Sequence, residues 1–207
     1  MIDDPKQLVA AGYDEIADVY LERFGESVVR REWLDRLIEN LQTAGSRVLD
    51  LGCGAGIPVA RDLAALGHAV VGIDASAQQI ARARVNVPKA TFVHADMCSV
   101  TFDANNFDAV GAFYAITHVP AGQQEALISN IATWLRPGGA FVASFGSGAA
   151  GEWAGEWLGT TMFFGHTDKA ETSRFLADAK LHVRSSAIQK QDNEDAAFLW
   201  IEATKES

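Results

Sequence analysis

The segment RVLDLGCGAGIPV at residues 47–59 constrains the fold more than any other part of the chain. An apolar run passes through Asp50, and glycines follow at positions 52, 54 and 56 before a predicted helix. Since glycine has no Cβ, such a turn can adopt positive φ and a ligand can lie against the bare backbone. The helix presents unpaired N–H groups to that ligand. A second apolar run ends about 20 residues later at Asp74, where a carboxylate can accept ribose hydroxyls. The pattern predicts a nucleoside-cofactor site.

Strands and helices are predicted to alternate along the middle of the chain. Apolar periodicity indicates strands at 47–51, 69–73, 90–94, 107–113 and 140–145, and helices at 58–66, 76–85 and 122–135. This alternation predicts an α/β fold with a parallel sheet and right-handed crossovers. Two helices, one over 6–24 and one that closes at Gly45, are predicted before it. Two strands, 181–190 and 197–203, are predicted to end the sheet as a hairpin.

Charge and composition exclude several classes of partner. The 207 residues include 17 Lys and Arg against 27 Asp and Glu, a net charge of −10, and the basic residues form no long run. Nucleic-acid binders normally carry a basic stripe, so we expect no nucleic-acid partner. No apolar run approaches the roughly 20 residues that a membrane span needs, and the first residues lack the pattern of a signal peptide. We therefore expect a cytoplasmic protein without a membrane partner.

The glycine spacing separates two kinds of nucleoside cofactor. The dinucleotide template G-x-G-x-x-G places Ile57 or Val59 at its third glycine, so it fits poorly. Residues 50–56 instead read D-x-G-x-G-x-G, which resembles the glycine loop of class I S-adenosylmethionine (SAM)-dependent methyltransferases. The runs GIPVARDLAALGHAVVGIDAS, HADM, THVP, WLRPGG and WLGTTMFFGHTD are similar to one branch of these enzymes, small bacterial methyltransferases with small-molecule substrates.

The resemblance implies a fold and a cofactor site. The fold is a Rossmann-like, seven-stranded, mostly parallel sheet with one antiparallel strand and helices on both faces. It forms a single domain over residues 1–207, with a helical cap over 1–44. In the family the glycine loop holds the methionine part of SAM, the acid after the second strand holds the ribose, and an acid after the third lies near adenine. The cofactor-binding candidates are Tyr13, Asp50, Gly52, Cys53, Gly54, Gly56, Asp74, Ala75, Asp96, Met97 and Phe113.

The loop after the fourth predicted strand is where the family places its acceptor. Enzymes that methylate nucleobase amino groups usually carry Asn/Asp-Pro-Pro-aromatic there, whereas this chain has Phe-Tyr-Ala-Ile at 113–116. His118 is a candidate general base because an imidazole titrates near neutral pH, although it could equally cap the loop before Pro120. The other catalytic candidates are Tyr114 and His166.

Residues 146–167 are predicted to form a long loop that covers the substrate. The segment combines glycines with large aromatic side chains, and long loops on compact domains are usually functional or disordered. A plain hydrophobic cover for the sheet edge is the alternative. Glu152 and Glu156 are expected to be solvated. The substrate-binding candidates are Trp153, Trp157, Phe163 and Phe164.

The leading hypothesis is direct displacement of the SAM methyl group by a nucleophilic atom of a small molecule, which releases S-adenosylhomocysteine (SAH). The alternatives are cleavage or cyclisation of SAM, methylation of a peptide or protein, an inactive SAM-dependent regulator, and a nicotinamide oxidoreductase. No dense cluster of His, Cys and carboxylates has metal-ligand spacing, so we expect no metal. A monomer or a homodimer is expected.

Overall fold

The structure is a computed structural model that describes residues 4–41 and 44–206. Residues 1–3, 42, 43 and 207 lie outside the described residues, and five of these six belong to the predicted cap over 1–44. The elements, in chain order, are α1 (Pro5–Phe24), α2 (Val28–Glu39), β1 (Arg47–Leu51), α3 (Val59–Ala65), β2 (Ala69–Asp74), α4 (Ala77–Asn86), β3 (Thr91–His94), β4 (Phe107–Ala112), the 3-10 helix η1 (Ile116–His118), α5 (Ala121–Trp134), β5 (Leu135–Gly146), β6 (Gly151–Trp157), β7 (Thr160–His166), α6 (Lys169–Asp178), β8 (Leu181–Lys190) and β9 (Ala197–Lys205).

Within the described residues, the main sheet has seven strands in the order β3-β2-β1-β4-β5-β9-β8. The first five pair in parallel, and β9 runs antiparallel to both of its neighbours. The predicted fold, a mostly parallel seven-stranded sheet with one antiparallel strand, is therefore confirmed. The chain adds β2 and β3 on one side of β1 and then crosses back to add β4 and β5 on the other side. The strand order therefore reverses at β1. Ligands of open α/β sheets bind beyond the strand ends at this point.

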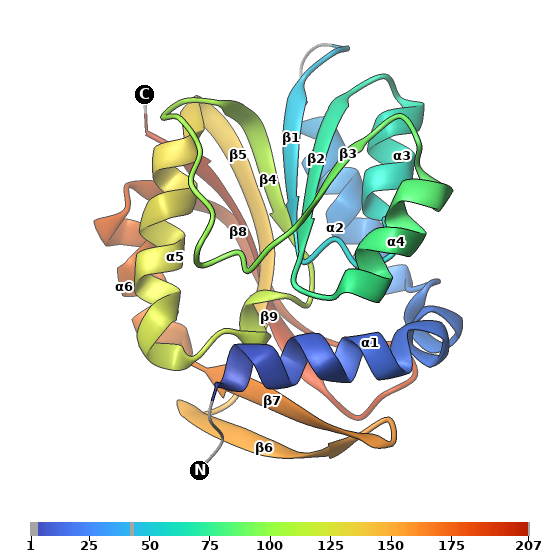
Figure 1. The fold of residues 1–207 in the computed structure, drawn as a ribbon. Coiled ribbons are helices and arrows are strands. Elements are labelled where there is room, and N and C mark those ends of the chain that lie inside the picture. The colour runs from blue at the N-terminus through green and yellow to red at the C-terminus, as the bar shows by residue number, and fades with distance from the viewer. Residues whose placement is uncertain (1–3, 42–43, 207) are drawn as a thin grey trace.

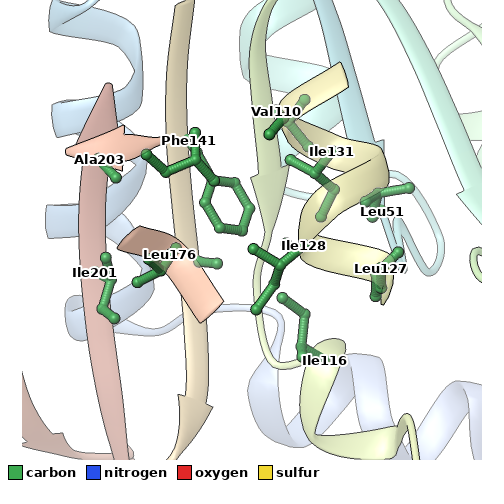
Figure 2. Packing of buried hydrophobic residues seen from close by; sticks show 14 of the residues in the cluster. Leu51, Val110, Ile116, Leu127, Ile128, Ile131, Phe141, Leu176, Ile201 and Ala203 are labelled. Atoms are coloured by element: carbon green, nitrogen blue, oxygen red, sulfur yellow. The ribbon is translucent and has the colours of Figure 1, made fainter. Parts of the chain in front are cut away.

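Hydrophobic residues alternate between the two faces of the sheet, as the period of a strand requires. Leu49 and Leu51 of β1 join a cluster with α5 and α6, whereas Val48 joins another with α2, α3 and α4. Figure 2 shows the first cluster, in which Leu127, Ile128 and Ile131 of α5 lie over Val110 and Phe141. Burial on both faces explains why β4 and residues 140–146 of β5 are apolar almost throughout.

The segment at 146–167 is where the predicted secondary structure was wrong. Residues 151–166 form a two-stranded antiparallel hairpin, β6–β7, and not an irregular loop. Its two central turn residues, Leu158 and Gly159, both have positive φ, 53° and 86°, as a type I′ hairpin turn requires. Leucine rarely occupies such a position, so the turn lacks the Asn-Gly signal that would have predicted it.

Helix ends account for the smaller differences. The second helix ends at Glu39, earlier than predicted. Ser76 caps α4 by accepting a hydrogen bond from the Gln79 N–H at 3.0 Å. Residues 136–139, predicted to separate a helix from a strand, belong to β5. Lys180 follows α6 with a φ of 58°, a left-handed conformation that favours glycine, so this helix end is strained.

Helix α1 and the β6–β7 hairpin lie across one end of the sheet, beside each other (Figure 1). Their packing is close, since a Cβ on Gly12 would lie 2.9 Å from Cε of Met162. β1 and β2 end near Asp50 and at Asp74, and the loops that follow these strands lie at this covered end of the sheet. Among the described helices, none has the length and apolar character needed to cross a bilayer.

Candidate functional site

The glycine loop is fixed by backbone hydrogen bonds to the end of β2. The N–H groups of Gly52 and Cys53 donate to the carbonyl of Ile73 at 2.8 and 3.0 Å. Gly52 has a φ of 69°, and a Cβ there would lie 2.4 Å from the Cβ of Ala115. Only glycine fits this approach of the loop to the chain after β4. Beside Gly54, by contrast, a Cβ would meet nothing nearer than Gln79 at 3.9 Å, which leaves open space along the backbone.

Asp74 joins the glycine loop to the start of α4. Its two carboxylate oxygens accept hydrogen bonds from the N–H groups of Gly54 at 2.8 Å and Ser76 at 2.9 Å. Burial raises the pKa of Asp74, and the two N–H donors oppose that rise. Asp14 of α1 accepts from the Ser76 hydroxyl at 2.5 Å, so α1 is attached to the same corner.

Two buried ionisable side chains, Asp50 and Arg30, lie near the glycine loop. Asp50 is only 2% exposed, and its Oδ2 has no hydrogen-bond partner among the described residues. Burial, reinforced by the charge of Asp74, raises the pKa of Asp50 to about 7. The guanidinium of Arg30 donates to the Phe24 carbonyl at 2.9 Å and to the Tyr20 hydroxyl at 3.3 Å. Both side chains line one small cavity at the glycine loop.

Most of the predicted cofactor residues line this cavity or a second one of about 80 Å³ above it. We call the two together the cofactor cavity; of the predicted residues it contains Tyr13, Asp50, Gly52, Cys53, Gly54, Asp74, Ala75, Met97 and Phe113.

Asp96 and Gly56 do not line the cofactor cavity, although both were predicted to bind the cofactor. The Asp96 carboxylate faces Lys6 of α1 at 2.7 Å and also accepts from the Cys98 N–H and the Ser99 hydroxyl, both at 2.9 Å. A Cβ on Gly56 would meet Phe92 and Val87, both at 3.2 Å. Asp96 therefore anchors α1, and Gly56 allows close packing behind the loop.

A larger cavity of about 300 Å³ lies under the β6–β7 hairpin; we call it the acceptor cavity. Half of its lining residues are aromatic: Tyr13, Tyr20, Tyr114, Trp153, Trp157, Phe164 and Phe198. The predicted residues Tyr114, His118, His166, Trp153, Trp157 and Phe164 all line it.

Phe163 is the exception among the predicted substrate residues. Successive side chains of a strand point to opposite faces, and Phe163 is 3% exposed within the cluster that α1 forms with the hairpin. Only its backbone reaches the site, since the Phe163 carbonyl accepts a hydrogen bond from Nδ1 of His118 at 2.8 Å.

Four residues, Tyr13, Tyr20, Tyr114 and His118, line both cavities and form their shared wall. In this wall the Tyr13 hydroxyl lies 2.8 Å from Nε2 of His118. Because a carbonyl can only accept, Nδ1 of His118 carries the proton that faces Phe163, and Nε2 accepts from Tyr13. Burial lowers the pKa of His118 to about 4, so the ring is neutral near pH 7. Burial also raises the pKa of Tyr114 to about 12.

Several residues of the site were not predicted. Arg30 lies on α2, and Glu194 lies in the turn between β8 and β9, where it accepts a hydrogen bond from Nε1 of Trp157 at 2.6 Å. Neither belongs to a recognisable motif. One signal in the sequence could have identified Arg30. It is a basic residue on the same buried side of a helix as Trp33 and Leu34, and a buried charge needs a partner. The unpredicted lining residues of the acceptor cavity are Tyr20, Thr117, Gln191, Glu194, Ala196, Ala197 and Phe198.

In the part of the chain that the structure describes, no group of three or more His, Cys, Asp and Glu side chains is placed to hold a metal ion.

The sequence of this chain is similar to those of known methyltransferases. Residues 48–139 match the family model described as a methyltransferase domain. An uncharacterized methyltransferase of Synechocystis sp. is 39% identical over 105 residues, which cover 50% of this chain and 49% of that protein. The 27-O-demethylrifamycin SV methyltransferase of Amycolatopsis mediterranei is 32% identical over 152 residues, or 63% of this chain and 55% of the relative. The chain thus spans about half the length of the curated relatives it matches.

The fold has a close counterpart among solved structures. The magnesium protoporphyrin IX methyltransferase of Synechocystis PCC 6803, crystallised with bound SAH, superposes with a TM-score of 0.75 at 17% identity and covers 98% of this chain and 100% of its own. Its likeness extends over nearly the whole chain, whereas the family model matches residues 48–139. Residues 48–139 are thus similar to a methyltransferase domain, and the whole sheet has the fold of solved S-adenosylmethionine-dependent methyltransferases.

Proposed function

We propose that this protein transfers the methyl group of SAM to a nucleophilic atom of a small molecule bound in the acceptor cavity. The observation that carries the proposal is the shared wall of Tyr13, Tyr20, Tyr114 and His118. A molecule in the cofactor cavity and a molecule in the acceptor cavity would meet at these four side chains. Two ligands that must react in line need such a contact and exclusion of water from it.

The chemistry of the cofactor cavity suits SAM. The methionine end of SAM carries an ammonium and a carboxylate, and the cavity offers Asp50 and Arg30, one charge of each sign. The unpartnered Oδ2 of Asp50 is an acceptor without a donor, which an ammonium would supply. Asp74 would hold the ribose, and Ala75 and Met97 would lie along the adenine.

SAM supplies a methyl group on an activated sulfonium. In the transfer the S–CH₃ bond breaks as the bond from the nucleophile to carbon forms, the electron pair returns to sulfur, and the proton of the nucleophile leaves to solvent. Positioning alone can supply roughly 7–11 kcal/mol of such a barrier. His118, with a pKa of about 4, is a weak base at neutral pH. We therefore assign it the role of orienting Tyr13, in place of the general base considered from the sequence.

The acceptor cavity favours a small molecule over a peptide or protein. Its volume of about 300 Å³ lies at the lower end of the range for small-molecule sites. The hairpin strands β6 and β7 cover it, and Trp157 closes one side through its hydrogen bond to Glu194.

The proposal can be tested with SAM that carries a heavy-isotope methyl group. The purified protein is incubated with it, alone and with a metabolite extract, and products are sought by mass spectrometry. We expect a small molecule carrying the heavy methyl group, and we expect it to be missing when Asp74→Ala replaces the native protein. Breakdown of SAM without the extract would instead indicate cleavage or cyclisation of SAM. Heavy label in the protein fraction alone would indicate a peptide or protein acceptor.

A further inference from the structure

Among the described residues that line the acceptor cavity there is one formal charge, and it is negative. Glu194 is the only carboxylate of that described lining, which includes neither Lys nor Arg. The two histidines of the cavity, His118 and His166, favour their neutral forms because burial lowers the pKa of each. An anionic ligand would therefore meet repulsion from Glu194 without a compensating cation.

Glu194 is held in place from two directions. Its Oε1 accepts the indole N–H of Trp157 at 2.6 Å. The turn that bears it is attached to α1, because Arg23 donates to the carbonyl of the neighbouring Asn193 at 2.9 Å and the Asn193 amide donates back to the Arg23 carbonyl at 3.2 Å. A fixed carboxylate of this kind loses little freedom when it binds a ligand.

Trp157 places an aromatic surface beside this carboxylate. Its ring centroid lies 6.2 Å from that of Tyr13, 6.1 Å from that of Tyr20 and 5.7 Å from that of Phe164, and all four rings line the cavity. The faces of such rings attract cations, most strongly where water is excluded. Aromatic walls around a single carboxylate form a site for an organic cation.

The nearby arginines do not fill this site. Arg30 lies behind the shared wall, with its guanidinium carbon 5.1 Å from the centroid of the Tyr114 ring, and it lines the cofactor cavity instead. The guanidinium carbon of Arg23 lies 5.4 Å from the centroid of the Phe24 ring, and Arg23 donates to a backbone carbonyl. Neither forms an ion pair with Glu194 among the described contacts.

We propose that the methyl acceptor carries a protonated amine, which binds between the Glu194 carboxylate and the ring of Trp157. This inference rests on the proposed function, because it takes the cavity under the hairpin to be the acceptor site. A protonated amine has no lone pair and therefore cannot attack the methyl group. It serves as the group by which the protein recognises the acceptor. The atom that receives the methyl group is a different one, at the shared wall. Glu194 is thus a specificity-determining residue.

Three probes of matched shape test the proposal. Phenethylamine, 2-phenylethanol and 3-phenylpropionate present a cation, a neutral group and an anion on the same ring and linker. Each is titrated calorimetrically into the full protein saturated with SAH. We expect the amine to bind about tenfold more tightly than the alcohol, the size of one well-placed charge interaction, and the acid to bind more weakly than either.

The matched variants are Glu194→Gln and Glu156→Gln, which remove the same charge. Glu156 is an exposed residue of β6. In Glu194→Gln the amide oxygen can still accept from Trp157, and we expect the preference for the amine to disappear. In Glu156→Gln it should persist. Equal binding of amine and alcohol by the native protein, no saturable binding of the amine, or an unchanged preference in Glu194→Gln would each overturn the proposal.

The titration with SAH itself is recorded first in the same preparations. A protein that binds SAH but shows no preference for the amine contradicts only the inference about the acceptor. A protein that fails to bind SAH contradicts the proposed function, whatever the probes do.

Discussion

The cofactor cavity and the acceptor cavity are built in different ways. The first is built around the glycine loop and the end of β2, and side chains of α1, α2 and the segment after β4 complete it. The second is made of side chains from α1, η1, the β6–β7 hairpin and the turn after β8. The hydrogen bond in the wall that the two cavities share joins Tyr13 to His118, which are 105 positions apart. The glycine loop is specified locally, whereas the acceptor cavity exists only once the chain has folded.

This difference indicates how substitutions in each cavity will affect the protein. A loop that binds through its backbone tolerates few substitutions at its glycines, because any side chain alters the shape of the site. A cavity formed by side chains from distant segments can be altered one side chain at a time while the sheet stays intact. Fold and cofactor can thus stay constant across a family while the acceptor varies.

The largest expected effect comes from Gly52→Ala. The new Cβ would lie 2.4 Å from Ala115 at a φ of 69°. Overpacking of this kind costs about 1–3 kcal/mol and the positive φ about 1–2 kcal/mol. We expect the affinity for SAH, measured by calorimetry, to fall about 100-fold.

Gly67→Ala is the matched control for this change. Gly67 has a φ of 87°, and a Cβ there would meet nothing within 4 Å. It should lower the free energy of unfolding by about 1 kcal/mol and leave SAH affinity as it is. Equal loss of SAH affinity in both variants would mean that the glycine loop does not depend on the close approach at Ala115.

The second prediction compares how Asp50 of the cofactor cavity and His118 of the shared wall make the stability of the protein depend on pH. Between pH 4 and 7 folded Asp50, with a pKa of about 7, holds a proton that the unfolded state has released, so its contribution to stability is lost as pH rises through this range. His118 has the opposite sign. Its folded pKa of about 4 lies below the unfolded value of 6.5, so its contribution is lost as pH falls. Each effect is on the order of 3 kcal/mol.

Urea unfolding at pH 7.5, 6 and 4.5 separates the two effects. We expect Asp50→Asn to lose stability on acidification more steeply than the native protein, and His118→Gln to gain stability instead. Asp96→Asn is the control. Burial raises the pKa of Asp96, but the hydrogen bonds from Lys6, the Cys98 N–H and Ser99 together outweigh burial and lower it from a usual value that already lies below this range. If both Asp50→Asn and His118→Gln kept the native pH dependence, the burial of these two groups would not govern it.

The fold could be predicted because its signals are local. Apolar runs ending at Asp50 and Asp74, with a glycine turn between them and the helices that follow, predict strands, crossovers and the cofactor loop together. The hairpin at 151–166 could not be predicted, because its turn places Leu158 at a φ of 53°, which tertiary packing against α1 imposes.

The site could be predicted only in part, for the same reason. Tyr13, Asp74 and Tyr114 were predicted on motifs, and each lines a cavity. Arg30 and Glu194 were not predicted as site residues. Their hydrogen-bond partners, Tyr20 and Trp157, lie 10 and 37 positions away along the chain. Asp96 was assigned to adenine from the family resemblance, and no local pattern reveals that Lys6 will face it.

The smallest expected effect lies outside both cavities, at the end of α6. Lys180 has a φ of 58°, a conformation that costs a residue with a Cβ about 1–2 kcal/mol. We expect Lys180→Gly to stabilise the protein by about 1 kcal/mol and raise Tm by about 2–4 °C, with SAH affinity unchanged. Lys180→Ala is the matched control, since it removes the same charge but keeps the Cβ. A Tm for Lys180→Ala as high as for Lys180→Gly would show that the backbone conformation is not the cause.

Tyr114 has the same φ of 58°, but it lies in the shared wall. Its ring centroid is 4.9 Å from that of Phe198 and 5.1 Å from that of Trp200. Tyr114→Gly would relieve the same strain and empty the wall between the two cavities, so we expect a loss of stability there, where Lys180→Gly brings a gain. The same backbone angle can be relaxed at one position and must be kept at the other, because only Tyr114 places a side chain where the two ligands would meet.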